Sequence, residues 1–173
     1  MPEGGLAPKV YLVGEAPGRQ EAEAGRPFVG PAGTALRDMM HEAGIDASQA
    51  RLANALPFRP IQRSAKRGLR NRKPTVNELR DYGPVVLADI TNVRPKLIIA
   101  LGRSAASLFG APITIDNARK QVFYFQGTPV RVTYHPGFVL RFGGRGSRLW
   151  RAAVRDLRRY WNLATSSSLT SVP

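Results

Sequence analysis

The chain has 173 residues, the length of one domain that can bury a hydrophobic core without disulfides or metal ions. Hydrophobic residues make up 43% and charged residues 22%, which excludes a wholly disordered protein. The formal net charge is +14, and the sequence has no cysteine and only two histidines. Disulfides, cysteine-ligated zinc, iron–sulfur clusters and multi-histidine metal sites are therefore not expected, and we expect no cofactor.

Short apolar runs alternate with helical patterns along the chain, which predicts an α/β domain with a mostly parallel sheet. A Gly- and Pro-rich loop is expected from Gly14 to Gly33, and a second loop over the aperiodic segment 59–73. Thr75 and Glu78 have the spacing of a capping box at the start of a long helix. We expect strands at 10–13, 52–56, 97–101, 122–125 and 130–133, and helices at 34–43, 75–92, 104–109 and 147–161.

We expect a single domain over residues 1–163 and a disordered tail over 164–173, where Ser and Thr predominate. The first nine residues lack the apolar region of a signal peptide, and no run approaches the length of a membrane span. A cytosolic protein with no membrane association is therefore expected.

The positive charge is concentrated in two segments. Segment 59–73 holds seven basic residues and no acid, and segment 141–159 holds seven basic residues against one acid. The rest of the chain has 12 basic and 11 acidic residues, so it is nearly neutral. This pattern favours a polyanion partner, of which nucleic acid is the commonest, although a charged loop exposed only to water remains the alternative for 59–73.

Three predicted strands are followed by residues that could form a site at one edge of the sheet. They are the segment Gly14–Gly18, Asn54, and His135 with its flanking Tyr and Pro. In open α/β sheets, ligands bind beyond the carboxyl ends of the strands. Each has a structural alternative: a plain turn for the glycines, a turn cap for Asn54 and a packing role for His135. Phe28, in a Gly/Pro loop, is either a core side chain or a flat surface for a ligand.

The motifs, taken together, resemble the uracil-DNA glycosylase superfamily, in particular its family 4 members. The order and spacing match from about residue 9 to residue 162. The resemblance implies a three-layer α/β/α fold with a central four-stranded, mainly parallel sheet. The matching segments are Gly14–Gly18, Gly25–Gly33, Asn54 followed by Arg59-Pro60, Arg94-Pro95-Lys96 before LIIALG, and Tyr134-His135-Pro136.

The same resemblance implies a monofunctional DNA repair hydrolase that flips deoxyuridine out of DNA and releases uracil, leaving an abasic site. In that family reading, Phe28 stacks on uracil and the Asn54 amide pairs with O4 and N3–H. His135 and backbone N–H groups near Ala16 bind O2, where negative charge develops. Glu15 positions or activates the attacking water, with Glu21 as the alternative.

Two departures from the family are visible. Family 4 members carry four cysteines that hold an iron–sulfur cluster, and Phe58 stands where one of them would fall. Segment 59–73 is longer and more basic than its family equivalent. Side chains in 138–145 would fill the gap left by the flipped base, with Arg141, Leu140 and Phe142 as candidates. The expected DNA-binding residues are Arg59, Arg63, Lys66, Arg67, Arg70, Arg72, Arg141 and Arg145.

Two other functions stay open at this point. Ala16 occupies a position where related families have a carboxylate. The first alternative is therefore a module that binds uracil or abasic sites in DNA with poor turnover, or that captures DNA covalently through His135. The second alternative is repair of a broader range of bases, including hypoxanthine or xanthine. The selectivity of an Asn54 amide argues against this alternative. A monomer is expected from the resemblance.

Overall fold

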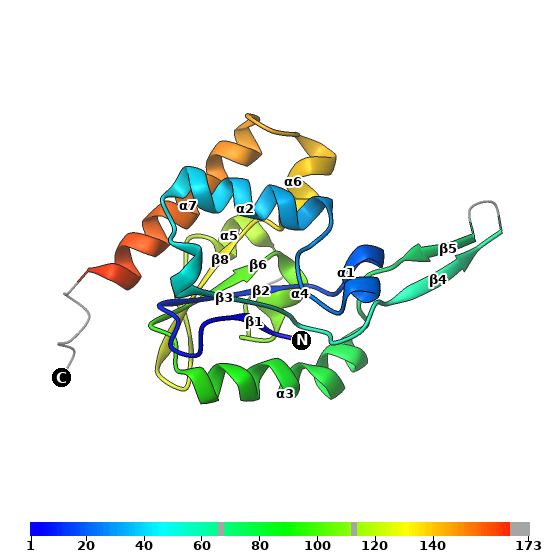
Figure 1. Ribbon diagram of the computed structural model, residues 1–173, viewed down its shortest axis with the longest axis horizontal. Helices are drawn as coiled ribbons and strands as arrows, with labels where there is room; N and C mark the ends of the chain where they lie inside the picture. Colours follow the sequence, from blue (N-terminus) through cyan, green and yellow to red (C-terminus); the bar gives the residue numbers. More distant parts are fainter. Residues whose placement is uncertain (66–67, 112–113, 167–173) are drawn as a thin grey trace.

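A computed structural model describes residues 1–65, 68–111 and 114–166. One mixed six-stranded sheet lies between two layers of helices (Figure 1). Its strand order is β1-β3-β2-β6-β8-β7. The strands are β1 Glu3–Gly4, β2 Val10–Gly14, β3 Ala50–Asn54, β6 Leu97–Leu101, β7 Phe123–Phe125 and β8 Thr128–Thr133.

The four inner strands, β3, β2, β6 and β8, are all parallel, as the family resemblance implied. The sheet nevertheless has six strands and not four, because β1 and β7 pair antiparallel at its two edges. The strand β1 has only two residues, Glu3 and Gly4, and contains no apolar run from which it could be predicted. The expected three-layer α/β/α fold is confirmed.

Both faces of the sheet are covered, and each inner strand alternates between them. Val10 and Leu12 pack against the layer of α2 Pro31–Ala43, α6 Pro136–Phe142 and α7 Arg148–Thr165. Tyr11 and Val13 pack against the layer of α3 Val76–Val93, α4 Arg103–Ser107 and α5 Ile115–Ala118. Strands that are buried on both faces have continuous apolar sequences. The inner strands could be predicted for this reason.

Local signals set most helix ends. The capping box of Thr75 and Glu78 is present at the start of α3, and Ser147 Oγ accepts a hydrogen bond from the Trp150 N–H at the start of α7. Helix α7 continues to Thr165, so it passes the domain end expected at residue 163. The rest of the expected tail, 167–173, lies outside the described residues. Within the described ranges, no helix is long and apolar enough to span a membrane.

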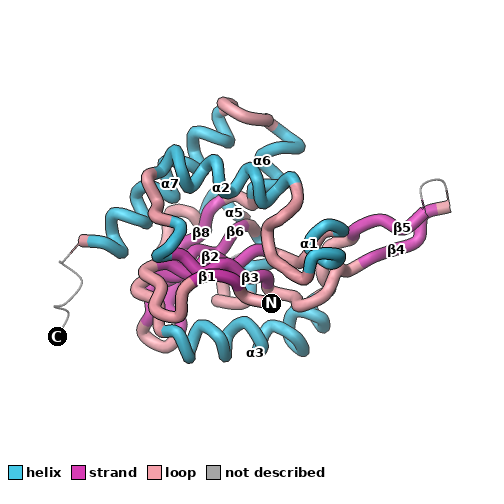
Figure 2. The backbone as a smooth tube through the Cα atoms, viewed as in Figure 1, coloured by secondary structure: helices cyan, strands magenta, loops and turns pink. Residues whose placement is uncertain are grey.

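Segment 59–73 is not a loop, as the sequence suggested, but contains a β-hairpin. Strands β4 Ile61–Ser64 and β5 Gly68–Asn71 pair antiparallel and project from the body of the protein (Figures 1 and 2). Both strands are exposed or half-buried and mostly polar, so they lack the apolar alternation of a strand that packs on a core. Short helices at Arg19–Ala24 (α1) and Pro136–Phe142 (α6) were likewise not predicted.

Candidate active site

The carboxyl ends of the inner strands bring the sequence-predicted site residues to one edge of the sheet. Gly14, at the end of β2, is in register with Asn54, at the end of β3. Thr133, at the end of β8, is in register with Leu101 of β6, and His135 follows two residues later. The segments that are distant in sequence therefore meet at the strand ends, the common location of ligand sites in parallel sheets.

The side chains of Asn54 and Phe28 converge at Gly14. A Cβ placed on Gly14 would lie 2.5 Å from Asn54 Oδ1 and 2.5 Å from Phe28 Cζ, closer than atoms can approach. A glycine is therefore needed here so that the backbone can lie against the amide and the ring. Phe28 is only 4% exposed, so its ring is a core side chain that packs beside Gly14 at this edge of the sheet.

The backbone of Phe28 is held in an unusual conformation. Its φ angle is 55°, in the left-handed region that non-glycine residues seldom adopt. The Arg37 guanidinium donates a hydrogen bond to the Phe28 carbonyl, and a Cβ on Gly33 would lie 1.8 Å from the same oxygen. Such conformations persist where neighbouring groups over-determine them, often at functional sites.

His135 is fixed by two glycines. It is the N-cap of α6, and its Nδ1 accepts a hydrogen bond of 3.1 Å from the N–H of Gly137. Gly102 has φ of 84°, and a Cβ there would lie 2.8 Å from the His135 Cβ. A neutral imidazole that accepts at Nδ1 carries its proton on Nε2, so Nε2 is the donor that remains for another group.

Burial lowers the pKa of His135 below its ordinary value of 6.5, whereas the nearby Glu15 and Glu21 carboxylates act in the opposite direction without cancelling the effect of burial. His135 is therefore neutral at pH 7. A neutral imidazole can donate from Nε2 to a ligand atom on which negative charge develops.

The two carboxylates have different surroundings. Ser104 Oγ, in α4, donates to Glu15 Oε2 at 2.5 Å. Glu21 instead accepts from two backbone groups, the N–H of Gly30 at 2.7 Å and the N–H of Gly18 at 3.1 Å. Glu21 thus links the loop that follows β2 to the loop that precedes α2. Ser104 was missed by sequence reasoning, since nothing in its local pattern indicates a partner 89 residues away.

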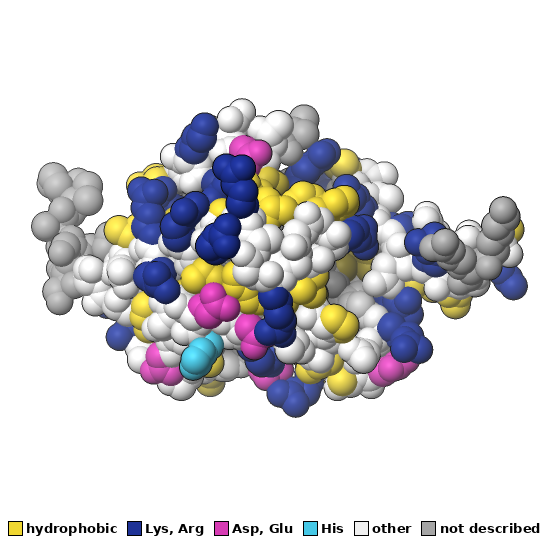
Figure 3. Space-filling model, turned by 90° about the horizontal axis from the view of Figure 1, so that it is seen from above, with side chains coloured by type: hydrophobic (Ala, Val, Ile, Leu, Met, Phe, Trp, Pro, Cys, Tyr) yellow, Lys and Arg dark blue, Asp and Glu magenta, His cyan; other side chains and the backbone are white. Residues whose placement is uncertain are grey.

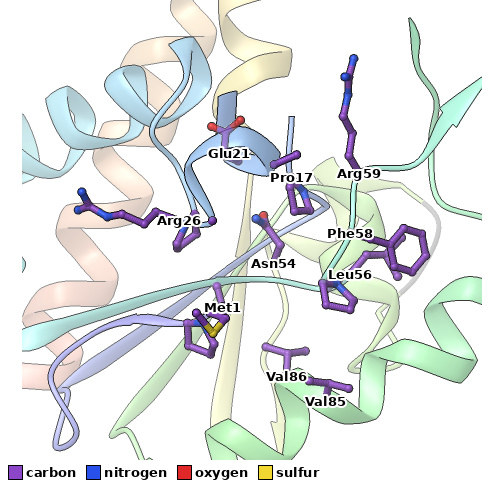
Figure 4. A pocket seen from close by; sticks show the side chains of 17 residues that line it. Met1, Pro17, Glu21, Arg26, Asn54, Leu56, Phe58, Arg59, Val85 and Val86 are labelled. Carbon is purple, nitrogen blue, oxygen red and sulfur yellow. The ribbon is translucent and has the colours of Figure 1, made fainter. Parts of the chain in front are cut away.

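A pocket of about 490 Å³ opens beside Asn54. Figure 4 shows the Asn54 side chain between Pro17 and Glu21 on one side and Val85 and Val86 on the other. The pocket is therefore mostly apolar with few polar groups, as small-molecule sites usually are. His135 and Phe28 are not among the residues that line this pocket.

The iron–sulfur cluster that family 4 resemblance implies does not fit the residues present. Such a cluster needs thiolate ligands, and the sequence has no cysteine. Phe58, at one cysteine position, is half-buried and packs edge-on against the Tyr82 ring with centroids 4.8 Å apart. In the described ranges, no three His, Asp or Glu side chains lie close enough to hold a metal ion. Aromatic packing therefore occupies this position.

Among the described basic residues of segment 59–73, some side chains are exposed and others form hydrogen bonds within the protein. Arg63 and Arg70 are exposed, and their register puts them on opposite faces of the hairpin. Arg59 donates to Asn71 Oδ1 at 2.6 Å. Arg72 makes two hydrogen bonds to the carboxylate of Glu78, at 2.6 and 2.7 Å. Lys66 and Arg67 lie outside the described residues.

The residues considered for the gap left by a flipped base lie on α6. Arg141 and Phe142 are exposed, with Phe142 at 63%, whereas Leu140 packs against the core. Arg145 forms an ion pair with Asp38 of α2, so it stabilises the packing of the two segments. Phe142 and Arg141 are therefore more accessible to a ligand at this edge than the half-buried Leu140.

The arginines of the second basic segment follow α7 away from the site. Lys and Arg side chains outnumber acids on the upper face, which α2, α6 and α7 form (Figure 3). The C-terminal end of α7 lies at the end of the molecule opposite the hairpin (Figure 1). The exposed arginines of α7 are Arg148, Arg151, Arg155, Arg158 and Arg159.

Comparison with known proteins agrees with this geometry. The family model of the uracil DNA glycosylase superfamily matches residues 1–158. The type-4 uracil-DNA glycosylase of Thermotoga maritima is 34% identical over 160 residues, which cover 91% of this chain and 78% of that protein. The type-4 uracil-DNA glycosylase of Archaeoglobus fulgidus is 35% identical over 141 residues, or 76% and 67% of the two chains. The resemblance found in the sequence motifs is confirmed, and the chain belongs to the uracil-DNA glycosylase superfamily of DNA repair enzymes.

Proposed function

We propose that this protein excises uracil from DNA by hydrolysing the N-glycosidic bond of a flipped deoxyuridine, and that it leaves an abasic site. The observation that carries the proposal is the convergence at Gly14 of the Asn54 amide and the Phe28 ring, at the same edge of the sheet as a neutral His135. A planar pyrimidine needs these three kinds of contact: an amide edge, an aromatic face and a donor for its O2.

Asn54 supplies base selectivity in this proposal. Its amide offers a donor and an acceptor side by side, which match O4 and N3–H of uracil. Cytosine presents the inverted pattern at the same edge, so the Asn54 amide would be left mispaired. A site built to hydrogen-bond one pattern rejects the other strongly, because the unpaired polar groups are costly.

His135 stabilises the departing base. As the glycosidic bond breaks, negative charge develops on uracil O2, and the Nε2–H of His135 donates to that oxygen together with backbone N–H groups near Ala16. A preformed donor in a water-poor site needs no reorganisation during the reaction, so it stabilises the charge that forms. The sugar becomes cationic at the same time, and Glu15 and the DNA phosphates stabilise it.

Glu15 is the residue that positions the attacking water. Both oxygens of Glu21 accept backbone hydrogen bonds, so Glu21 is occupied in joining two loops. Among the described residues, the Glu15 carboxylate accepts one hydrogen bond, from Ser104, which orients the carboxylate and leaves its other oxygen for water. A carboxylate in hydrogen-bond reach of water typically contributes about 10²–10⁴-fold to such a step.

The DNA duplex lies along this edge of the sheet in the proposed complex. The exposed Arg63 and Arg70 of the hairpin contact phosphates, and Phe142 or Arg141 of α6 enters the gap left by the flipped nucleotide. The protein acts as a monomer, and DNA association places it at the nucleoid.

A strand-cleavage assay tests the activity. A labelled duplex or single strand containing one deoxyuridine is treated with the protein in EDTA and then with alkali. We expect cleavage at the deoxyuridine, no cleavage of a matched thymidine strand, and loss of cleavage in Asn54→Ala. The absence of alkali-labile sites in both substrates would refute the proposal.

A second candidate is a DNA-binding module that recognises uracil or abasic sites and turns over poorly. The observation that favours it is Ala16, which occupies a position where related families have a carboxylate. Release of one uracil per protein, with tight retention of the product, would support it, whereas fast multiple turnover would exclude it. A denaturing gel would reveal a covalent adduct through His135.

A further inference from the structure

Three aromatic rings, Tyr134, Phe138 and Phe142, form a continuous row that begins beside His135; we call this row the aromatic ladder. Tyr134 and Phe138 are stacked with an interplanar angle of 16° and centroids 6.1 Å apart. Phe138 and Phe142 have centroids 4.8 Å apart. The spacing of four residues puts the two Phe rings on one face of α6.

The aromatic ladder is fixed at one end and open at the other. The Arg119 guanidinium lies 4.3 Å from the Tyr134 ring centroid, and the Tyr134 hydroxyl donates to Asp116. At the other end, Phe138 is 45% exposed and Phe142 is 63% exposed. Large apolar side chains exposed together on a soluble domain indicate a surface that contacts something else.

The surroundings favour nucleic acid as that partner. His135 is the N-cap of the same helix, so the aromatic ladder continues directly from the catalytic edge. Arg141 is exposed on α6, and this helix carries no acidic residue. Proteins that bind single strands combine positive charge, which attracts phosphates, with aromatic rings on which bases stack.

We propose that the aromatic ladder is a stacking platform for unpaired bases next to the flipped nucleotide in single-stranded DNA. The inference rests on the proposed function, because it assumes that DNA occupies this edge. It goes beyond filling a gap in a duplex, since a stacking platform acts where no complementary strand is present.

Binding without chemistry tests the inference. A short thymidine oligonucleotide is compared with an abasic oligonucleotide of equal phosphate number, at matched salt, by fluorescence anisotropy. We expect the wild type to prefer the strand with bases, and each of Phe138→Ala and Phe142→Ala to weaken that binding about tenfold. Both variants should bind the abasic strand as the wild type does. Tyr124→Ala is the control. It removes an aromatic ring that is 68% exposed on the β7 edge strand, and should change the affinity for neither oligonucleotide.

Several outcomes would overturn the inference. Unchanged affinity of both Phe138→Ala and Phe142→Ala for the thymidine strand would show that the rings do not stack on bases. Self-association of the wild type that is abolished in Phe142→Ala would show that the ladder is a protein interface. Neither oligonucleotide contains uracil, so this experiment can succeed when uracil excision fails, and the two proposals fail separately. Thermal unfolding checks that each variant is folded.

Discussion

The backbone N–H of Gly137 donates to Nδ1 of His135 at 3.1 Å, so the first turn of α6 orients the imidazole from its own helix. The bond requires an unprotonated Nδ1. Protonation would place an N–H of the ring against the N–H of Gly137, and the pair would become repulsive. The orientation of His135 is therefore coupled to its charge, in the same direction as the effect of burial on its pKa.

This coupling predicts the acid limb of the pH profile. Because the pKa of His135 is lowered from 6.5, the ring stays neutral until the pH falls well below that value. We expect the single-turnover rate of uracil release to fall with a midpoint below pH 6.5. Folding stability should decrease in the same direction, since the unfolded chain binds this proton at a higher pH than the folded one.

A control separates His135 from the carboxylates, which also titrate in acid. His135→Gln keeps a neutral donor but cannot titrate, so the limb due to histidine should disappear while a reduced rate remains. A wild-type midpoint at or above pH 6.5, or an unchanged limb in His135→Gln, would contradict the assignment.

Gly14→Ala should abolish most of the activity with little change in folding elsewhere. The added Cβ would displace the Asn54 amide and the Phe28 ring, both 2.5 Å away. Displacements of this size can reduce a rate about 10²-fold. Single-turnover kinetics measure the loss. Gly5→Ala is the matched control, because its Cβ would meet nothing closer than 3.4 Å, and it should leave the rate unchanged.

Glu15 and Glu21 should respond differently to the same isosteric change. Glu15→Gln should lower the chemical step about 10²–10⁴-fold with little change in the free energy of unfolding. Glu21→Gln retains one acceptor oxygen for two backbone N–H groups, and should lower the free energy of unfolding by about 1–3 kcal/mol. Urea unfolding and single-turnover assays on both variants test this. The opposite pattern would transfer the water-positioning role to Glu21.

Much of the fold was predictable, because its signals are local or repeated. The strand Leu97–Leu101 is apolar throughout because it is buried on both faces, and Thr75 with Glu78 marks the start of α3 within four residues. The hairpin was not predictable, since its two short strands pack on no core. Arg72 holds its base by donating to the Ile61 carbonyl and to Glu78, contacts that no periodicity reveals.

The same distinction applies to the site. Gly14, Asn54 and His135 were identified because each lies at or just beyond the end of a strand, and parallel strands end at one edge. The bond from Ser104 to Glu15 and the two bonds to Glu21 could not be predicted, because side-chain partners depend on how loops close over the sheet. The sequence favoured Glu15 over Glu21 only through the family resemblance, whereas the structure shows that the two carboxylates have different hydrogen-bond partners.

The hairpin offers a test of which arginines serve DNA and which serve the fold. Arg70→Ala removes an exposed charge, and should lower the salt slope of duplex binding by about one with no effect on unfolding.

Arg72→Ala removes a different kind of arginine. In the wild type, the Arg72 guanidinium lowers the pKa of Glu78 to about 2. The stability that this pair gives is present above pH 4.5 and lost as the pH falls toward 2, so the variant should be less stable than the wild type at pH 7 but not near pH 2. Salt titrations of binding and unfolding curves at the two pH values measure both effects. Equal salt slopes for Arg70→Ala and the wild type would show that the hairpin does not contact phosphates.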